Sequence, residues 1–197
     1  TRRTIVEMLK GINPATFHLF KLNPEEFIIK AGRIINDCKA ISLIQHIQYE
    51  KRTGTFGTYI FEEATLRGTL GRDAIESTKS LYDLVVVDSE GIEKNFAESL
   101  EAEDDVVVYS KLPGGFYINT PMGKYNPDWA VAFREGTVKH IYFVAETKGN
   151  DIEVSQLRHS EDAKIECARR HFAAISTGDV VYSVVKTYRD LYNAVTK

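Results

Sequence analysis

Three charged residues lie at the ends of two apolar stretches in the middle of the chain. Asp128 precedes Trp129–Phe133, and Glu146 and Lys148 follow Ile141–Ala145. Each stretch predicts a β-strand, and alternate side chains of a strand point to the same face, so Glu146 and Lys148 share a direction. If the two strands pair, two carboxylates and one ammonium group converge on a small patch.

The chemistry of such a patch is that of a hard divalent cation. Mg²⁺ is bound by one or two carboxylates together with water and the phosphate of a substrate. An ammonium group beside it can orient a water molecule or stabilise the charge that develops on a phosphate. The alternative is that Asp128, Glu146 and Lys148 are surface charges at strand ends. A charge next to an apolar strand is costly unless it is paired or used, which favours the metal site.

The residues around these charges resemble a known family. Pro127-Asp128 followed by Glu146-Thr147-Lys148 resembles the signature of the PD-(D/E)xK nucleases. Three longer stretches, in order, resemble more narrowly the C-terminal endonuclease domain of the restriction subunit of type III restriction-modification enzymes: GKYNPDWAVAF, YFVAETKG and AKIECARRHF. The resemblance extends over most of the chain and is weakest in the N-terminal part.

The resemblance implies a role for each residue of the motif. Asp128 and Glu146 are expected to bind Mg²⁺, helped by the backbone carbonyl of Thr147, and Lys148 is expected to position the attacking water. The expected reaction is hydrolysis of DNA phosphodiester bonds. The family often has a further acidic residue on the preceding helix, and Glu93 is the candidate for this position.

The alternative for Glu93 is an exposed helical glutamate that lies beside Lys94, which needs no function. Glu98 is a rival candidate that is less well placed on the helix. Lys111 and the pair Arg169-Arg170 are candidate contacts to backbone phosphates, although a solvated helix face also accounts for the arginines.

The family context implies partners that these residues do not supply. The substrate is expected to be double-stranded DNA, and a modification (methyltransferase) subunit is expected to provide sequence recognition. The chain has no GxxxxGK[ST] stretch, so ATP is expected to bind only to a helicase-like motor elsewhere in the full-length chain. Because the chain begins with Thr-Arg-Arg rather than Met, we expect an excised fragment. The expected setting is the bacterial cytoplasm, in defence against phage.

Bulk composition is that of an ordinary globular protein. The 197 residues are 43% hydrophobic and 27% charged, with a net charge of −3, so any DNA-binding surface must be local. Cys38 and Cys167 lie far apart in sequence, and no cysteine or histidine spacing indicates zinc. The apolar runs are too short to cross a membrane, and no signal peptide is visible.

The expected fold class is α/β, a restriction-endonuclease-like core in which helices flank a mixed sheet. Residues 1–60 are expected to form a helical and hairpin appendage, a linker from the motor, and residues 61–197 the endonuclease domain. In the appendage, helices are predicted at 3–10 and from Asn23-Pro24 onward, and alternation predicts a strand within 41–49.

In the second part, strands are predicted at 81–88, 106–112, 116–118 and 180–187 besides the two motif strands. Helices are predicted at 90–100, 151–174 and 188–195. Two other readings remain open: a repair or recombination nuclease of the same superfamily, and a non-catalytic nuclease-like domain that binds DNA or a partner.

Overall fold

The computed structural model describes residues 2–51, 53–54, 57–62, 67–89, 91–134, 141–146, 155–178 and 180–196. Within these ranges, the side chains of Leu19, of residues 141–146 and of residues 155–160 are not described.

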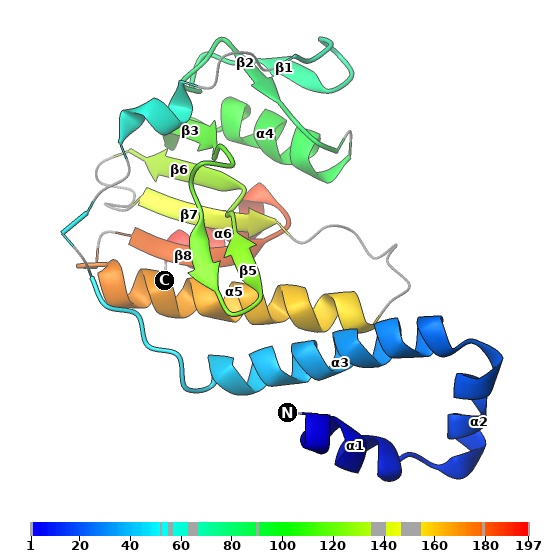
Figure 1. Ribbon diagram of the computed structural model, residues 1–197. Coiled ribbons are helices and arrows are strands. Elements are labelled where there is room, and N and C mark those ends of the chain that lie inside the picture. Colours follow the sequence, from blue (N-terminus) through cyan, green and yellow to red (C-terminus); the bar gives the residue numbers. More distant parts are fainter. Residues whose placement is uncertain are drawn as a thin grey trace.

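A four-stranded mixed sheet forms the centre of the molecule (Figure 1). Its strands lie in the order β3 (Val106–Lys111), β6 (Trp129–Phe133), β7 (Ile141–Glu146) and β8 (Val180–Val185). The first two pairs of neighbours are antiparallel and the last pair is parallel. The parallel pair needs a crossover connection, which the long helix α5 (Ser155–Ile175) provides.

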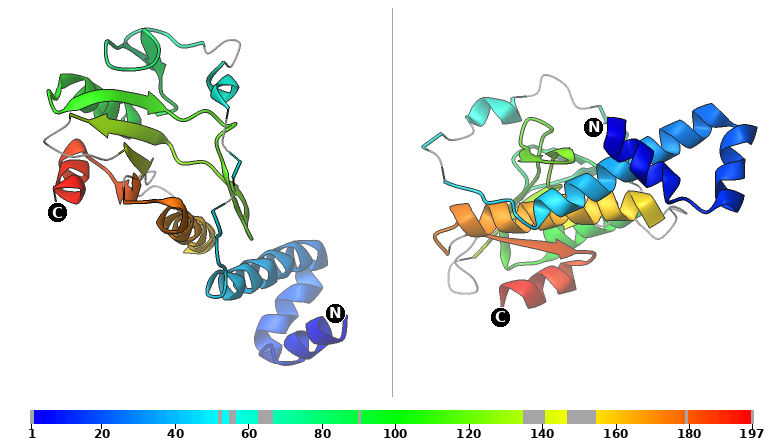
Figure 2. Two further views of the ribbon diagram at one scale, coloured as in Figure 1. Left: turned by 90° about the vertical axis from the view of Figure 1, so that its left-hand side faces the viewer. Right: turned by 60° about the horizontal axis from the view of Figure 1, so that its bottom comes forward.

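Helices cover both faces of this sheet (Figure 2). On one face, α4 (Ile92–Ala102) and α6 (Tyr188–Val195) pack on β3 and β6 through a core that includes Phe96, Leu191 and Trp129. On the other face, α5 packs beside a small antiparallel ribbon, β4 (Ile118–Thr120) with β5 (Gly123–Tyr125). The alternation in β6 explains the first core, because Trp129, Val131 and Phe133 are buried while the alanines between them are half-buried.

A second small ribbon lies beyond α4 and consists of β1 (Ala74–Glu76) paired antiparallel with β2 (Leu84–Val86). The strand predicted at 81–88 is therefore present but shorter. Its partner β1 falls before the strand predicted at 81–88, in a segment where no strand was predicted. A 3₁₀ helix, η1 (Thr58–Phe61), lies before that segment.

The N-terminal part consists of three helices: α1 (Arg2–Lys10), α2 (Pro14–Leu22) and α3 (Pro24–Ile44). Asn23 caps α3 as predicted, since its Oδ1 accepts the backbone N–H of Glu26 at 3.1 Å. The C-terminal half of α3 lies beside α5, where Ile44 packs against Ala163 and Cys167.

One prediction in this part is wrong. The strand expected within 41–49 does not form, because residues 41–44 continue α3 and the described residues from 45 to 57 contain no strand. The appendage is therefore helical in its described residues and has no hairpin there. Ala40 and Ile44, four residues apart, are both buried, so the spacing that matters is that of a helix face on α5.

The other predicted elements of the second part are found with small shifts of their ends. The domain boundary near residue 60 stays a prediction. Among the described residues, no helix is both long and apolar enough to cross a membrane.

Candidate active site

Asp128 and Glu146 come from neighbouring antiparallel strands and lie at the same end of the sheet. Trp129 in β6 pairs with Val144 in β7. Asp128 immediately precedes Trp129, and Glu146 follows Val144 by two residues, so the register brings the two backbone positions together. Thr147 and Lys148 lie outside the described residues, as does the side chain of Glu146.

Strand β3 brings a third charged residue, Lys111, to this end of the sheet. Lys111 pairs with Trp129, and the next residue, Leu112, donates its backbone N–H to the carbonyl oxygen of Asp128 at 2.8 Å. Side chains of directly opposed residues share a face. Lys111 therefore lies on the face that carries Trp129 and that α4 covers.

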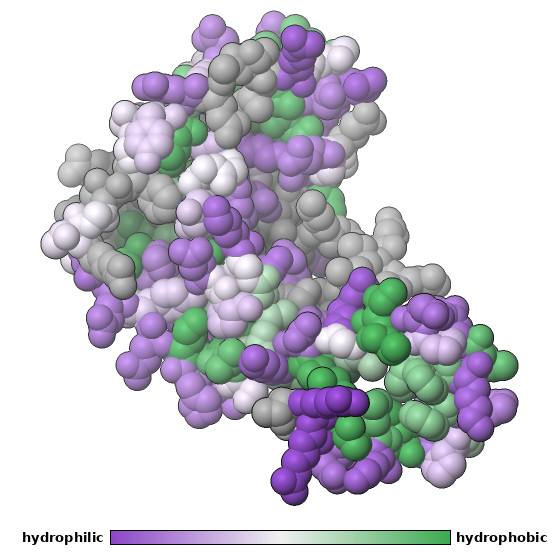
Figure 3. Space-filling view, viewed as in Figure 1, coloured by the Kyte–Doolittle hydropathy of each residue, from purple (hydrophilic) through white to green (hydrophobic). Residues whose placement is uncertain are grey.

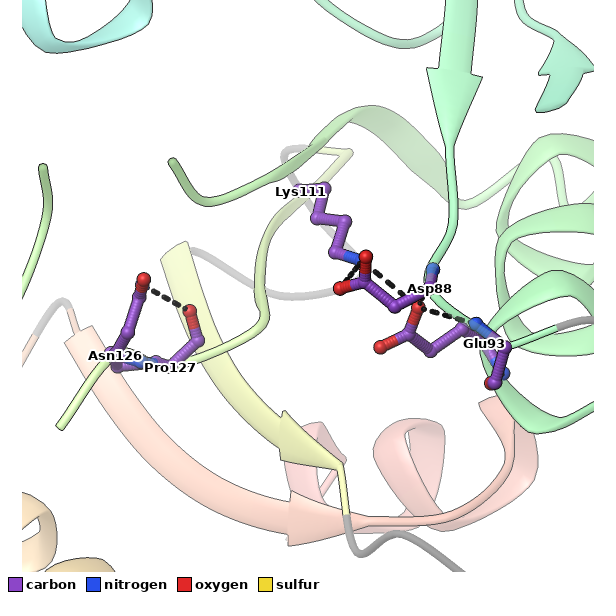
Figure 4. A network of polar contacts seen from close by, with 6 residues as sticks. Asp88, Glu93, Lys111, Asn126 and Pro127 are labelled. Atoms are coloured by element: carbon purple, nitrogen blue, oxygen red, sulfur yellow. Dashed lines mark hydrogen bonds and ion pairs between the residues drawn. The ribbon is translucent and has the colours of Figure 1, made fainter. Parts of the chain in front are cut away.

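On that face Lys111 forms two ion pairs (Figure 4). Its Nζ lies 2.9 Å from Oε2 of Glu93 and 2.6 Å from Oδ2 of Asp88. The side chains of Lys111 and Glu93 are 21% and 5% exposed, whereas that of Asp88 is 76% exposed. The ammonium group thus links a buried carboxylate to one at the surface.

The local sequence explains why Glu93 is buried. Glu93 stands in the first turn of α4, where a negative charge is favourable. Its Oε2 accepts the backbone N–H groups of Asp88 at 2.6 Å and Ser89 at 3.3 Å, and the Ser89 hydroxyl accepts the N–H of Glu93 at 3.2 Å. The rival Glu98 is exposed. Of the two candidates on α4, Glu93 is the one directed inward.

The charge of Lys111 is maintained in this environment. Burial lowers the pKa of the ammonium group, but the hydrogen bonds and negative charges of Asp88 and Glu93 outweigh burial, so the pKa lies above its ordinary value. Lys111 is therefore a fixed positive charge beside the candidate site. The sequence suggested Lys111 only as a phosphate contact; its position at the end of an apolar strand, like that of Glu146, was the signal for a paired charge.

Asp128, which immediately precedes β6, has a different environment from Glu93. It is half-buried and lies in a bend that follows the buried Pro127. Two tyrosines, Tyr125 and Tyr182, share a hydrogen bond of 2.7 Å between their hydroxyl groups. Burial is the main cause of the raised pKa of both hydroxyls, and the negative charge of Asp128 raises both further. The Asp128 carboxylate thus lies within electrostatic range of both hydroxyl groups.

Oxygen donors at this end of the sheet suit a hard cation. The described part of the chain supplies the carboxylates of Glu93, Asp88 and Asp128, and β7 ends in a further acidic residue, Glu146. No cluster of three or more potential ligand residues is formed by the described side chains alone. Carboxylate oxygens of this kind are the donors that Mg²⁺ prefers.

Two other sequence candidates have structural contacts. Arg170 donates to the carbonyl oxygens of Ile44 at 2.7 Å and Gln45 at 3.3 Å, at the end of α3. Arg169 lies 3.7 Å from Glu166 on the same helix. The Arg170 contacts join α5 to α3, and with the ion pair of Arg169 they account for the arginine pair without DNA.

Comparison with protein families identifies the class. Residues 78–188, more than half of the chain, match the model of an endonuclease domain family. The chain belongs to this family. The match includes α4 and all four strands of the central sheet, and it excludes the N-terminal helices α1–α3. It contains the candidate residues Glu93, Lys111, Asp128, Glu146 and Lys148. No curated protein and no solved structure matches the chain.

Proposed function

We propose that this domain is a Mg²⁺-dependent endonuclease of the PD-(D/E)xK type that hydrolyses phosphodiester bonds of double-stranded DNA. The observation that carries the proposal is the pairing of β6 with β7, which brings Asp128 and Glu146 to one end of the sheet within the matched endonuclease region. The buried Glu93 at the same end adds a third carboxylate.

In this proposal Asp128, Glu146 and Glu93 hold the metal ion, and the backbone carbonyl of Thr147 completes the protein ligands. The bound metal would lower the pKa of a water molecule and stabilise negative charge on the phosphate. Lys148 would position the attacking water in line with the leaving oxygen. The water oxygen forms a bond to phosphorus and loses a proton to solvent, while the opposite P–O bond breaks and the leaving oxygen takes up a proton.

The proposed setting is the restriction subunit of a type III restriction-modification enzyme in the bacterial cytoplasm, where it defends against phage. The three stretches around the motif support this setting, and the matched family agrees with the nuclease activity. A modification subunit would provide recognition, and an ATP-driven motor in the full-length chain would provide movement along DNA. A net charge of −3 agrees with an isolated domain that binds DNA weakly.

Nicking of a supercoiled plasmid tests the activity. The fragment is incubated with Mg²⁺ or Mn²⁺, and wild type is compared with Asp128→Ala and Lys148→Ala. We expect metal-dependent nicking that both substitutions reduce by at least 100-fold, since each removes a direct participant. If the fragment alone is inactive, the same variants are assayed in the full-length subunit with its modification partner and ATP. Variants that still cleave there would refute the proposed site.

One observation favours a second candidate, a nuclease-like domain that only binds DNA or a partner. The Glu93 carboxylate is accounted for by its backbone contacts and by Lys111, without a metal. Such a domain would show no stabilisation by Mg²⁺ or Mn²⁺, and Asp128→Ala would leave its thermal stability and DNA affinity unchanged. A repair or recombination nuclease would instead cleave DNA without requiring a modification subunit.

A further inference from the structure

The carboxylate of Glu93 uses its two oxygens unequally. Every hydrogen bond and ion pair of this carboxylate with described residues goes to Oε2, from the amides of Asp88 and Ser89 and from Lys111. The other oxygen, Oε1, points away from those amides (Figure 4). One oxygen is thus saturated, and the orientation of the group is fixed before any ligand arrives.

Lys111 would be a poor neighbour for a metal ion if charge alone mattered. A fixed ammonium group repels a divalent cation, and burial weakens the screening of that repulsion by solvent. The chain nevertheless places this ammonium group 2.9 Å from Oε2, with its side chain 21% exposed. Asp88 holds it from the other side at 2.6 Å. The arrangement costs metal affinity unless it improves the geometry of the carboxylate.

We propose that Lys111 is a positioning residue for Glu93. Its ammonium group and the two backbone amides hold Oε2, and this leaves Oε1 as the oxygen that Glu93 presents to the metal beside Asp128 and Glu146. Partners that orient a metal-binding carboxylate in this way commonly change metal affinity by 10- to 100-fold when they are removed. The inference rests on the proposed function, because it needs a metal at this end of the sheet.

The direction in which one substitution changes metal affinity separates this role from a purely electrostatic one. Lys111→Met removes a positive charge and keeps a long apolar side chain. If Lys111 only repels the cation, its loss tightens metal binding. If Lys111 orients Glu93, its loss weakens metal binding, because only the two amides then hold the carboxylate.

The experiment measures the affinity of this chain for Mn²⁺ from the electron paramagnetic resonance signal of the free ion, without DNA or ATP. The variants are Lys111→Met, Glu93→Gln and the double variant, and Lys94→Met is the matched control. Lys94 is adjacent to Glu93 in sequence, but its Nζ binds the carbonyl oxygen of Gly71 at 2.7 Å instead. Thermal unfolding without metal confirms that each variant is folded, and Lys111→Gln replaces Lys111→Met if the latter does not fold.

We expect Lys111→Met to bind Mn²⁺ at least tenfold more weakly and Lys94→Met to bind within about twofold of wild type. The double variant should bind no more weakly than Glu93→Gln, because Lys111 acts through Glu93. Unchanged or tighter binding by Lys111→Met, or losses that add in the double variant, would overturn the inference. If wild type binds no Mn²⁺, the metal site of the proposed function fails and the inference fails with it. If wild type binds Mn²⁺ and Glu93→Gln binds it equally well, the metal site stands and the inference alone fails.

Discussion

The central sheet and the N-terminal helices bury apolar side chains to very different degrees. In β6, Trp129 and Val131 are both 0% exposed. In the N-terminal part, α1 has no buried residue, and Leu22, Ile28 and Ile29 are 70%, 62% and 63% exposed. Figure 3 shows hydrophobic residues at the surface of this region, around α1–α3. The N-terminal helices thus carry many apolar side chains that they leave at the surface, whereas the sheet buries its own.

This difference in burial indicates what stabilises each region and what positions the residues of the candidate site. Of the described residues of the candidate site, Lys111 and Glu93 stand on β3 and α4, which share one core, so packing fixes their backbone. The helices α1–α3 depend on local interactions and on the contact of the end of α3 with α5. That contact consists of the small apolar cluster around Ile44 and Cys167 and the two hydrogen bonds of Arg170.

Trp129→Ala should have the largest effect, because it removes the largest fully buried side chain. The ring packs near Phe96 and Tyr109, with centroids 5.8 Å and 6.2 Å away. We expect a loss of about 3–5 kcal/mol in the free energy of unfolding, measured by urea denaturation. A loss below about 1 kcal/mol would mean that this core does not carry the stability of the sheet.

Arg170→Met should loosen the contact between the regions and leave the sheet intact. It removes the hydrogen bonds to Ile44 and Gln45, worth about 1–2 kcal/mol, so the amides of α3 should exchange with solvent roughly tenfold faster. Hydrogen exchange of β6 should not change. Arg169→Met is the control, because Arg169 makes only the ion pair with Glu166 among its described contacts to acidic side chains. Equal effects of both variants would contradict the role of Arg170.

Glu101 attaches the segment between β1 and β2 to the core, and its effect should depend on pH. Its carboxylate accepts hydrogen bonds from Ser77, Thr78 and Tyr109. Burial alone would raise its pKa, but these bonds outweigh burial and lower the pKa from 4.5 to about 2. A lowered folded-state pKa stabilises the fold above the ordinary pKa, and this contribution is lost as the pH falls towards 2.

Glu101→Gln should therefore cost about 1 kcal/mol at pH 7, after allowance for screening by solvent. The difference from wild type should shrink between pH 4.5 and pH 2, as followed by urea denaturation at each pH. A difference that is constant over this range would show that the charge of Glu101 does not contribute.

Ile29→Ala should have the smallest effect. The side chain is 63% exposed on α3, so its truncation should change the free energy of unfolding by less than about 0.5 kcal/mol. A loss above about 1.5 kcal/mol in the same urea experiment would show that the N-terminal helices bury this residue in solution, and the contrast between the regions would disappear.

The sequence predicted the sheet and its helices well because their patterns are strong. Alternation in Trp129–Phe133 and the helical spacing of Phe96, Ala97 and Leu100 correspond to the buried faces of β6 and α4. Thr187 and Asp190 form a capping box at the start of α6, and the predicted helix at 188–195 has the observed bounds.

The N-terminal part was harder to predict because few of its residues are buried. Alternation of Ile41 and Leu43 suggested a strand, but Leu43 is 50% exposed, so this alternation marks no buried face. Helix α2 was missed because its hydrophobic residues do not mark a single face. Phe17 and Phe20 instead pack with Phe27 of α3, with ring centroids 5.3–6.3 Å apart.

For the candidate site, the sequence offered Glu93 as a further acidic residue on the preceding helix, and its side chain is buried. The partnership of Glu93 with Lys111 could not be read from the sequence, because it depends on which face of β3 lies against α4. The roles of Asp128, Glu146, Thr147 and Lys148 remain predictions that depend on activity.

The most direct test compares the same chemical change at the two ends of the sheet. Asp128→Asn alters the proposed site, and Asp105→Asn alters the turn before β3, at the opposite end, where the Asp105 carbonyl oxygen accepts the N–H of Arg134. The measurement is the rate of Mg²⁺-dependent plasmid nicking in the most complete assembly that is active. We predict that Asp128→Asn loses at least 100-fold and that Asp105→Asn stays within about threefold of wild type. Cleavage that survives in Asp128→Asn, or that both variants lose equally, would contradict the assignment of this end of the sheet as the nuclease site.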